Sequence, residues 1–157
     1  MEFLLFLSSN EKKILELIYK AGFSVEENSP LCLIGKKYVG FTKSKQKSVI
    51  ICTQNIKERH KYINSKSTFV YKKDNLKTAI SIKKALRHEA THVAQACNNS
   101  EPLGVIKTKG NIHQWYKRDA IEGSTNIGTG KKEKEEEAYY MEQQPKKLIT
   151  ALRKYCL

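Results

Sequence analysis

The sequence predicts one α+β domain over residues 1–157, in which a small antiparallel sheet packs on a long helix and further helices complete the core. Three observations predict this class. The chain has 157 residues and 39% of them are hydrophobic, which suits a single modest core. Short β-branched and aromatic stretches lie between Leu31 and Thr53. Apolar residues recur at helical spacing on both sides of that region.

The first helix is predicted over residues 9–21. Ser8 is followed three residues later by Glu11, which is the pattern of a capping box at a helix N-terminus. Gly22 then ends the helical pattern. The apolar residues at helical spacing in this segment are Ile14, Leu15, Leu17, Ile18 and Ala21.

Three short strands are predicted next, at residues 31–34, 37–42 and 47–53. Gly35 separates the first two, and a polar segment separates the second from the third. Strands joined by such short connections usually pair with each other, so we expect an antiparallel sheet.

The longest helix is predicted from Asp74, a good N-cap residue, to about Cys97. Residues 100–130 are rich in Gly, Ser, Thr and Asn, so we expect a loop there, interrupted by a short helix at 115–121. Two further helices are predicted at 131–144, ended by Pro145, and at 147–157.

Lysine and arginine number 29 and acidic residues 16, for a formal net charge of +13. A charge of this size favours acidic partners, so weak electrostatic binding to nucleic acid is one interpretation, and a lysine-rich surface that only contacts solvent is the other. Most of these cations are lysine, whereas arginine is the residue that reads base edges, so sequence-specific DNA recognition is not predicted.

The apolar segment at residues 3–7 is short and follows Glu2, so neither a signal peptide nor a membrane span is predicted, and no membrane partner. We therefore expect a cytoplasmic protein, or a virion-associated one if a phage encodes it. The four cysteines are widely spaced and form no Cys-x-x-Cys pair, which favours small core residues over disulfides or zinc ligands. They are Cys32, Cys52, Cys97 and Cys156.

The chemistry is concentrated in the long predicted helix, where residues 87–92 read Arg-His-Glu-Ala-Thr-His. At 3.6 residues per turn, His88 and His92 lie about 40° apart and one turn along the axis, so both imidazoles can reach one metal ion. Glu89 lies beside them, where it can bind a water without being a ligand. Neutral imidazoles suit Zn²⁺.

A chance occurrence of this motif is a poor explanation, because the composition predicts it only about 0.01 times in a chain of this length. The remaining alternative to a metal site is that both histidines have other hydrogen-bond partners at the edge of the buried face. A third ligand has to come from elsewhere in the chain. Residues 133–140 read Glu-Lys-Glu-Glu-Glu-Ala-Tyr-Tyr and offer carboxylates on another helix.

His-Glu-x-x-His followed on a later helix by Glu-x-x-Ala resembles the gluzincin group of zinc metallopeptidases, and is similar to the small ImmA/IrrE-type proteins and related compact proteins of bacteria and phages. The resemblance implies a compact zincin-like domain with the sheet on the active-site helix. It implies that Glu135 is the third zinc ligand, with Glu137 as the alternative, and that Ala138 lets the two helices approach. Tyr139 stands where many gluzincins have an acidic or amide residue that orients a histidine ligand.

The function implied is a zinc-dependent metallopeptidase that acts on a polypeptide substrate. Zinc would lower the pKa of a water, and Glu89 would take its proton as general base. The side chains of chemically suitable type to stabilise the developing oxyanion are Tyr139, Tyr140, His113 and Tyr116. The alternative function is a non-catalytic binding or structural protein, for example a virion component, that zinc only stabilises and that associates with nucleic acid through its charge.

Overall fold

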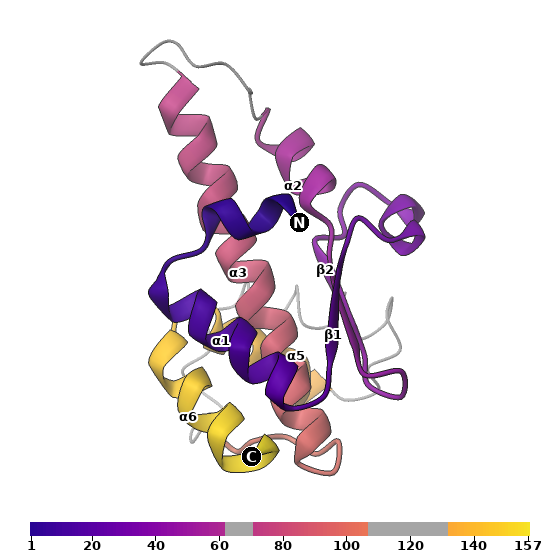
Figure 1. The fold of residues 1–157 in the computed structure, drawn as a ribbon, viewed down its shortest axis with the longest axis vertical. Coiled ribbons are helices and arrows are strands. Elements are labelled where there is room, and N and C mark those ends of the chain that lie inside the picture. Colours follow the sequence, from indigo (N-terminus) through magenta and orange to yellow (C-terminus); the bar gives the residue numbers. More distant parts are fainter. Residues whose placement is uncertain (62–70, 107–131) are drawn as a thin grey trace.

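The computed structural model describes residues 1–61, 71–106 and 132–157, apart from the side chains of residues 71–74. It confirms the α+β class (Figure 1). The longest helix, α3 (Tyr71–Cys97), contacts the sheet as well as α1, α5 and α6. In Figure 1 the sheet lies along one side of α3, and α1 and α6 pack against each other on the other side.

The N-terminal part begins with the 3-10 helix η1 (Glu2–Phe6), followed by α1 (Ser9–Lys20), which confirms the helix predicted at 9–21. The predicted capping box is formed by Ser8 and Glu11. Such reciprocal bonds satisfy the free N–H groups of the first helical turn. After α1 the chain turns through Gly22, whose φ of +80° is a conformation that glycine adopts without strain.

The sheet has three strands, β1 (Ser24–Glu27), β2 (Gly40–Lys43) and β3 (Ser48–Ile51), in the order β1-β3-β2. β2 pairs with β3 in antiparallel orientation, whereas β1 pairs with β3 in parallel. The prediction of a purely antiparallel sheet was therefore wrong. The sequence of β1, Ser-Val-Glu-Glu, carries little apolar signal because the strand lies at the edge of the sheet and is half exposed.

The strand predicted at 31–34 was also wrong, because this segment is the 3-10 helix η2 (Pro30–Ile34). Pro30 occupies the first turn, where its missing N–H is not needed, and the Ser29 hydroxyl accepts a bond from the N–H of Leu31 at 3.4 Å. The other two predicted strands are confirmed in shorter form as β2 and β3.

Helix α3 begins at Tyr71 rather than at Asp74, so the predicted N-cap was wrong. It is preceded by the short helix α2 (Thr53–Arg59) and followed by α5 (Lys132–Met141) and α6 (Pro145–Cys156). The helices predicted at 131–144 and 147–157 are thus confirmed with shifted ends. The helix predicted at 115–121 lies outside the described residues.

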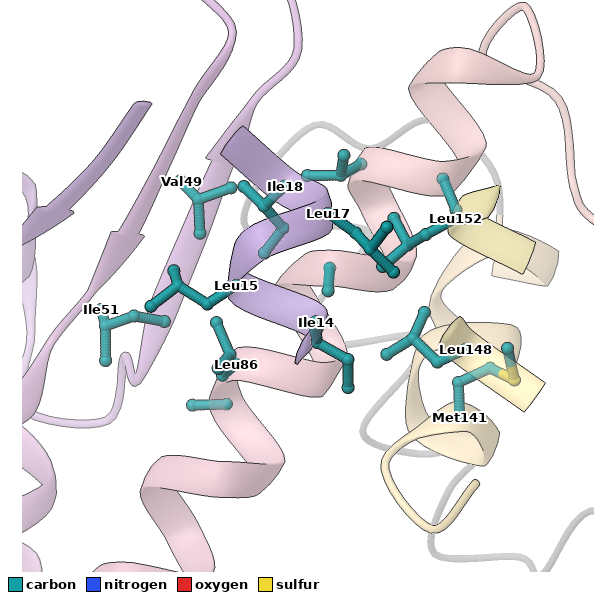
Figure 2. Close-up of a cluster of buried hydrophobic side chains, with 14 of the residues drawn as sticks. Ile14, Leu15, Leu17, Ile18, Val49, Ile51, Leu86, Met141, Leu148 and Leu152 are labelled. Atoms are coloured by element: carbon teal, nitrogen blue, oxygen red, sulfur yellow. The ribbon is translucent and has the colours of Figure 1, made fainter. Parts of the chain in front are cut away.

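The core is built mainly from aliphatic side chains of α1, β3, α3 and α6 (Figure 2). Figure 2 shows Leu15 and Ile18 of α1 on the side of β3, and Leu17 close to Leu152 of α6. Each such side chain contributes about 1.5–3 kcal/mol when fully buried. This packing fixes α3 on its apolar side, which includes the fully buried Leu86, and so fixes the direction of the His-Glu-x-x-His residues.

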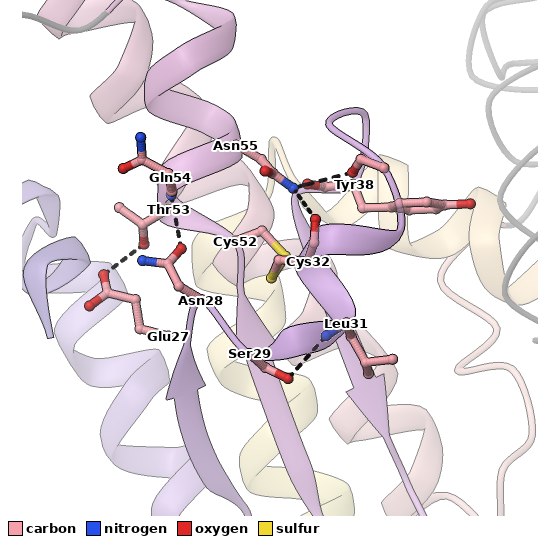
Figure 3. The surroundings of a disulfide bond; sticks show 11 residues. Glu27, Asn28, Ser29, Leu31, Cys32, Tyr38, Cys52, Thr53, Gln54 and Asn55 are labelled. Carbon is pink, nitrogen blue, oxygen red and sulfur yellow. Dashed lines mark hydrogen bonds between the residues drawn. A yellow bond between two sulfur atoms is a disulfide. The ribbon is translucent and has the colours of Figure 1, made fainter.

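The four cysteines form two disulfides, which corrects the prediction that they are unpaired core residues. Cys32–Cys52 joins η2 to the end of β3, with a Cα–Cα distance of 5.5 Å (Figure 3). Next to it, the Asn55 amide donates to the carbonyls of Cys32 at 2.9 Å and Tyr38 at 3.0 Å. Sequence spacing gives no sign of this pairing, because the fold brings residues 20 positions apart together.

The second disulfide, Cys97–Cys156, joins the last residue of α3 to the last residue of α6 across a separation of 59 residues. This disulfide therefore links α3 directly to α6, the helices that precede and follow α5 in the described chain.

None of the helices within residues 1–61, 71–106 and 132–157 combines the length and the apolar character needed to cross a bilayer.

Candidate metal centre

His88 and His92 extend from the same face of α3 toward Glu135 on α5. Their polar atoms lie close together: His88 Nε2 is 3.3 Å from His92 Nε2 and 3.2 Å from Glu135 Oε2, and His92 Nε2 is 3.1 Å from Glu135 Oε1. Glu135 is 1% exposed. Helical geometry alone aligns the two imidazoles, and the packing of α5 on α3 brings the carboxylate to them.

The spacing and chemistry of these atoms fit a zinc ion. Zinc bonds of about 2.0–2.1 Å in tetrahedral geometry place neighbouring ligand atoms about 3.3 Å apart. Glu135 Oε1 is buried, and it accepts no hydrogen bond when the imidazole beside it, His92 at 3.1 Å, is neutral with its lone pair on Nε2. A buried carboxylate oxygen without a donor is costly, and a cation at this point would satisfy it.

Two polar side chains orient the imidazoles. His88 Nδ1 lies 3.0 Å from Glu142 Oε1, and His92 Nδ1 lies 2.8 Å from Gln95 Oε1. Since a carboxylate and an amide oxygen can only accept, both Nδ1 atoms carry the proton in the neutral rings. The lone pair is then on Nε2, the atom that faces Glu135.

The carboxylates around the histidines favour a positive charge in the site. Burial lowers the pKa of His88, but hydrogen bonds to Glu135 and Glu142 outweigh burial and hold this pKa well above its usual value. Burial raises the pKa of Glu135, yet the hydrogen bonds from His88 and His92 bring it far below its usual value. The site is therefore built for a cation, which a proton or a metal ion can provide.

Glu89 is buried, 4% exposed, and its carboxylate is held apart from the three clustered atoms. Its Oε2 accepts a hydrogen bond from the Thr42 hydroxyl of β2 at 2.8 Å. Burial raises the pKa of Glu89 above its usual value, against the opposing effect of His88 and His92. Glu89 thus lies beside the cluster and is not one of its members.

The cluster and Glu89 open onto a pocket of about 190 Å³. The pocket is bounded by the sheet on one side, by the C-terminal end of α3 on another, and by α5. Besides the residues already described, its walls are formed by Phe41, Ser44, Ala96, Ser100 and Lys134. A ligand in this pocket would reach both the clustered atoms and the Glu89 carboxylate.

Glu137, the alternative third ligand, does not point to the histidines. Its carboxylate accepts backbone N–H bonds from Leu103 at 2.8 Å, Gly104 at 2.7 Å and Val105 at 3.3 Å, and a bond from the Gln95 amide at 3.0 Å. Glu137 therefore anchors the segment after α3 and, through Gln95, supports the orientation of His92.

Of the four predicted oxyanion donors, Tyr139 and Tyr140 lie in the described residues, and neither of them lines the pocket. Tyr139 packs edge-on against the His88 ring, with 4.6 Å between centroids, and the Tyr140 hydroxyl accepts a bond from Lys147 Nζ at 2.6 Å. His113 and Tyr116 lie outside the described residues.

Sequence reasoning missed Glu142, Gln95 and Thr42. Gln95 lies three residues after His92, and Glu142 lies seven residues after Glu135, so helical spacing places each on the face of a ligand. That spacing is a signal that could have found them. Thr42 has no such local signal, because only the packing of β2 on α3 brings it to Glu89.

A protein-family model described as a domain of unknown function (DUF8637) matches residues 3–157. The match covers the helix that carries His88 and His92 as well as the helix that carries Glu135. No curated protein and no solved structure matches the chain.

Proposed function

The chain belongs to the DUF8637 family, and we propose that it is a zinc metallopeptidase that hydrolyses peptide bonds. One observation carries this proposal. Two imidazole nitrogens and a buried carboxylate oxygen lie within bonding reach of one cation, and a separately held carboxylate, Glu89, lies beside them at an open pocket.

The donor set supports zinc in a catalytic rather than a closed structural role. Two histidines and one glutamate are a ligand set of catalytic zinc sites, which keep a further position open, whereas structural sites use four protein ligands. Bound Zn²⁺ supplies a Lewis acid that polarises a carbonyl and lowers the pKa of water. The pocket next to His88, His92 and Glu135 gives a substrate access to that position.

Glu89 would act as the general base. Its carboxylate accepts the proton of the attacking water and returns it to the amine that leaves when the peptide bond breaks. Burial raises its pKa, which makes Glu89 a stronger base than an exposed glutamate and favours uptake of the proton from water. His88 and His92, held by Glu142 and Gln95, keep their Nε2 lone pairs directed to the cation.

An edge strand supports a polypeptide as the substrate. β2 lies at one end of the strand order, and no other strand of the described residues pairs with its outer edge. Phe41 and Thr42 of this strand line the pocket. An extended peptide can add to such an edge through main-chain hydrogen bonds and so pass its carbonyls across the site.

The two disulfides favour a different location from the cytoplasm predicted from the sequence. Disulfides form and persist in oxidising environments, and they are rare in cytosolic proteins. We propose that the protein folds and acts in an oxidising compartment or outside the cell.

The proposed function is tested with purified, disulfide-bonded protein loaded with zinc and a library of peptides of diverse sequence, with cleavage followed by mass spectrometry. The wild type should cleave, and a zinc chelator should abolish cleavage. Glu89→Gln should keep zinc but lose activity by about 10²–10⁴-fold, because general base catalysis is removed. Glu136→Gln is the matched control, since in the part of the chain that the structure describes Glu136 forms a partly exposed ion pair with Lys132 at 3.7 Å and no contact with the cluster.

Full activity of Glu89→Gln, or cleavage that survives complete removal of zinc, would contradict the proposal. The alternative function is a non-catalytic binding or structural protein that zinc only stabilises. It is favoured by one feature: the clustered residues come from both α3 and α5, so a bound zinc ion would link the two helices. Zinc that is retained without cleavage of any peptide, together with a large fall in the melting temperature on chelation, would indicate that zinc only stabilises the fold.

A further inference from the structure

We propose that strand β2 sets the position of the general base, with Thr42 as a positioning residue for Glu89 and Gly40 as the residue that leaves space for it. This inference rests on the proposed function, because it assigns roles within the same site. It concerns the two β2 positions that contact Glu89.

The Thr42 hydroxyl lies 2.8 Å from Glu89 Oε2 and 3.1 Å from the backbone carbonyl oxygen of Glu89. A hydroxyl has one proton to donate, and a bond to a carboxylate is the stronger of the two. Glu89 is 4% exposed, so few waters can replace this donor. Thr42 therefore fixes one oxygen of the carboxylate.

Gly40 contacts the same side chain from the next position on this face of the strand. A Cβ atom at residue 40 would lie 2.8 Å from Glu89 Cγ and 2.9 Å from Glu89 Oε1. Both distances are shorter than carbon makes with such atoms. The glycine is thus explained by the close approach of Glu89 and not by an unusual backbone angle.

The alternation of the strand explains why these two positions act together. Residues two apart in a strand face the same side, so Gly40 and Thr42 both face α3 while Phe41 faces the opposite side. Phe41 accordingly packs in a separate apolar cluster with Ile50 and the Cys32–Cys52 disulfide. β2 therefore presents one face to Glu89 and the other to a small core of its own.

Holding Glu89 in this way has a consequence for the reaction. Glu89 is adjacent in sequence to His88, and its carboxylate is of the same kind as that of Glu135, so an unrestrained side chain could turn toward the cation and become a ligand. A carboxylate fixed by Thr42 and closely packed on Gly40 stays free to accept a proton. The role of β2 is then to prevent Glu89, the proposed base, from turning toward the cation and becoming a further ligand beside Glu135.

The first test is the activity of Thr42→Val, which removes the hydroxyl at nearly constant volume. We expect kcat to fall by about 10–100-fold with little change in KM or zinc content, because the base is misplaced while the metal ligands are not. Thr42→Ser restores the hydroxyl and should recover most of the activity. Thr150→Val is the matched control, since Thr150 is exposed on α6 and its hydroxyl donates to the Lys146 carbonyl, far in sequence from β2 and Glu89. Equal kcat values for Thr42→Val and the wild type would overturn the proposal.

The second test does not depend on activity and uses a double-mutant cycle on the melting temperature of the zinc-loaded protein. Gly40→Ala should lower the melting temperature, and this loss should shrink in a Glu89→Ala background, because the atoms that crowd the new Cβ are gone. The contact with the Ile50 carbonyl oxygen at 3.0 Å is present in both backgrounds and cancels.

If Gly40→Ala lowers the melting temperature equally in the wild-type and the Glu89→Ala backgrounds, the placement of Glu89 against Gly40 is overturned. If the wild type cleaves no peptide, the proposed function fails, whereas the cycle still decides whether β2 holds this carboxylate. The two failures are therefore distinguishable.

Discussion

Glu142 offers a sharp test of the proposed metal centre, because in the described residues its side chain contacts His88 and would affect a bound zinc ion through that histidine. Its Oε1 lies 3.0 Å from His88 Nδ1, and its side chain is largely buried. Removing it with Glu142→Ala leaves His88 Nδ1 without its acceptor and frees the ring to rotate. The backbone carbonyl of Glu142, which accepts a bond from Arg87 at 2.7 Å, is kept in this variant.

Loss of a partner that orients a histidine ligand typically weakens metal binding by about 10–100-fold. This corresponds to about 1.4–2.7 kcal/mol of zinc binding free energy. Glu142→Gln should have a smaller effect, because its amide oxygen can still accept from Nδ1 although the charge is lost. The assay is competition for zinc with a chromophoric chelator near neutral pH, which gives the ratio of Kd values.

The control for this experiment is Glu136→Ala, which removes a carboxylate from α5, the helix just before Glu142; among the described residues this carboxylate forms an ion pair with Lys132 and contacts no histidine. It should leave the zinc Kd unchanged. The reasoning is refuted if Glu142→Ala binds zinc as tightly as the wild type, or if the control loses as much affinity.

Three further predictions concern stability. Arg87→Ala should lower the free energy of unfolding by about 3–5 kcal/mol in urea titrations, because it leaves the fully buried Glu11 carboxylate unpaired. Burial raises the pKa of Glu11, but the hydrogen bonds from Ser8 and Arg87 outweigh it and hold this pKa below 4.5. Around these pH values the folded state therefore binds fewer protons than the unfolded state. The contribution of the Glu11 carboxylate to stability is present above about pH 4.5 and is lost as the pH falls through the lowered pKa. Urea unfolding midpoints measured at decreasing pH test this. Replacing Cys97 and Cys156 with alanine should cost about 4 kcal/mol on chain-entropy grounds, for a separation of 59 residues.

Each of these predictions has a specific contrary outcome. Glu16→Gln removes a carboxylate from a surface ion pair with Lys13 and is the control for the buried pair of Arg87 and Glu11. Equal losses of unfolding free energy in Glu16→Gln and Arg87→Ala would contradict the role given to Arg87. An acid unfolding profile that Arg87→Ala leaves unchanged would contradict the assignment to Glu11. An unfolding midpoint that is the same with and without the Cys97–Cys156 bond would contradict its structural role.

The parts of the structure that the sequence predicts are those fixed by local geometry. The capping box of Ser8 and Glu11 forms because its partners are three residues apart, and His88 and His92 share a face because they are four apart. The apolar spacing of residues 9–21 likewise places the helix that the structure contains.

The parts that the sequence does not predict depend on distant contacts. Parallel pairing of β1 with β3 joins two segments that are separated in sequence by η2 and β2, and the polar sequence of β1 carries no periodic signal. The two disulfides likewise depend on which distant segments the fold brings together. Cysteine spacing alone therefore led to the wrong prediction that the four cysteines are unpaired.

The choice between Glu135 and Glu137 shows the same limit within the site. Both lie on α5, two residues apart. Side chains two residues apart in an α-helix point about 160° away from each other around the helix axis, so only one of the two can face the histidines of α3. The rotation of α5 decides which, and that rotation is set by packing on α3 and by the backbone amides that bind Glu137. The resemblance pointed to Glu135 with Glu137 as the alternative, and in the structure the packing of α5 on α3 brings Glu135 to the two histidines.

The most direct test of the metal centre is the zinc content per chain, measured by inductively coupled plasma mass spectrometry after extensive dialysis. The wild type should retain one equivalent of zinc, whereas His88→Ala and Glu135→Ala should each retain almost none. A wild type that holds no zinc, or variants that hold as much as the wild type, would contradict the account.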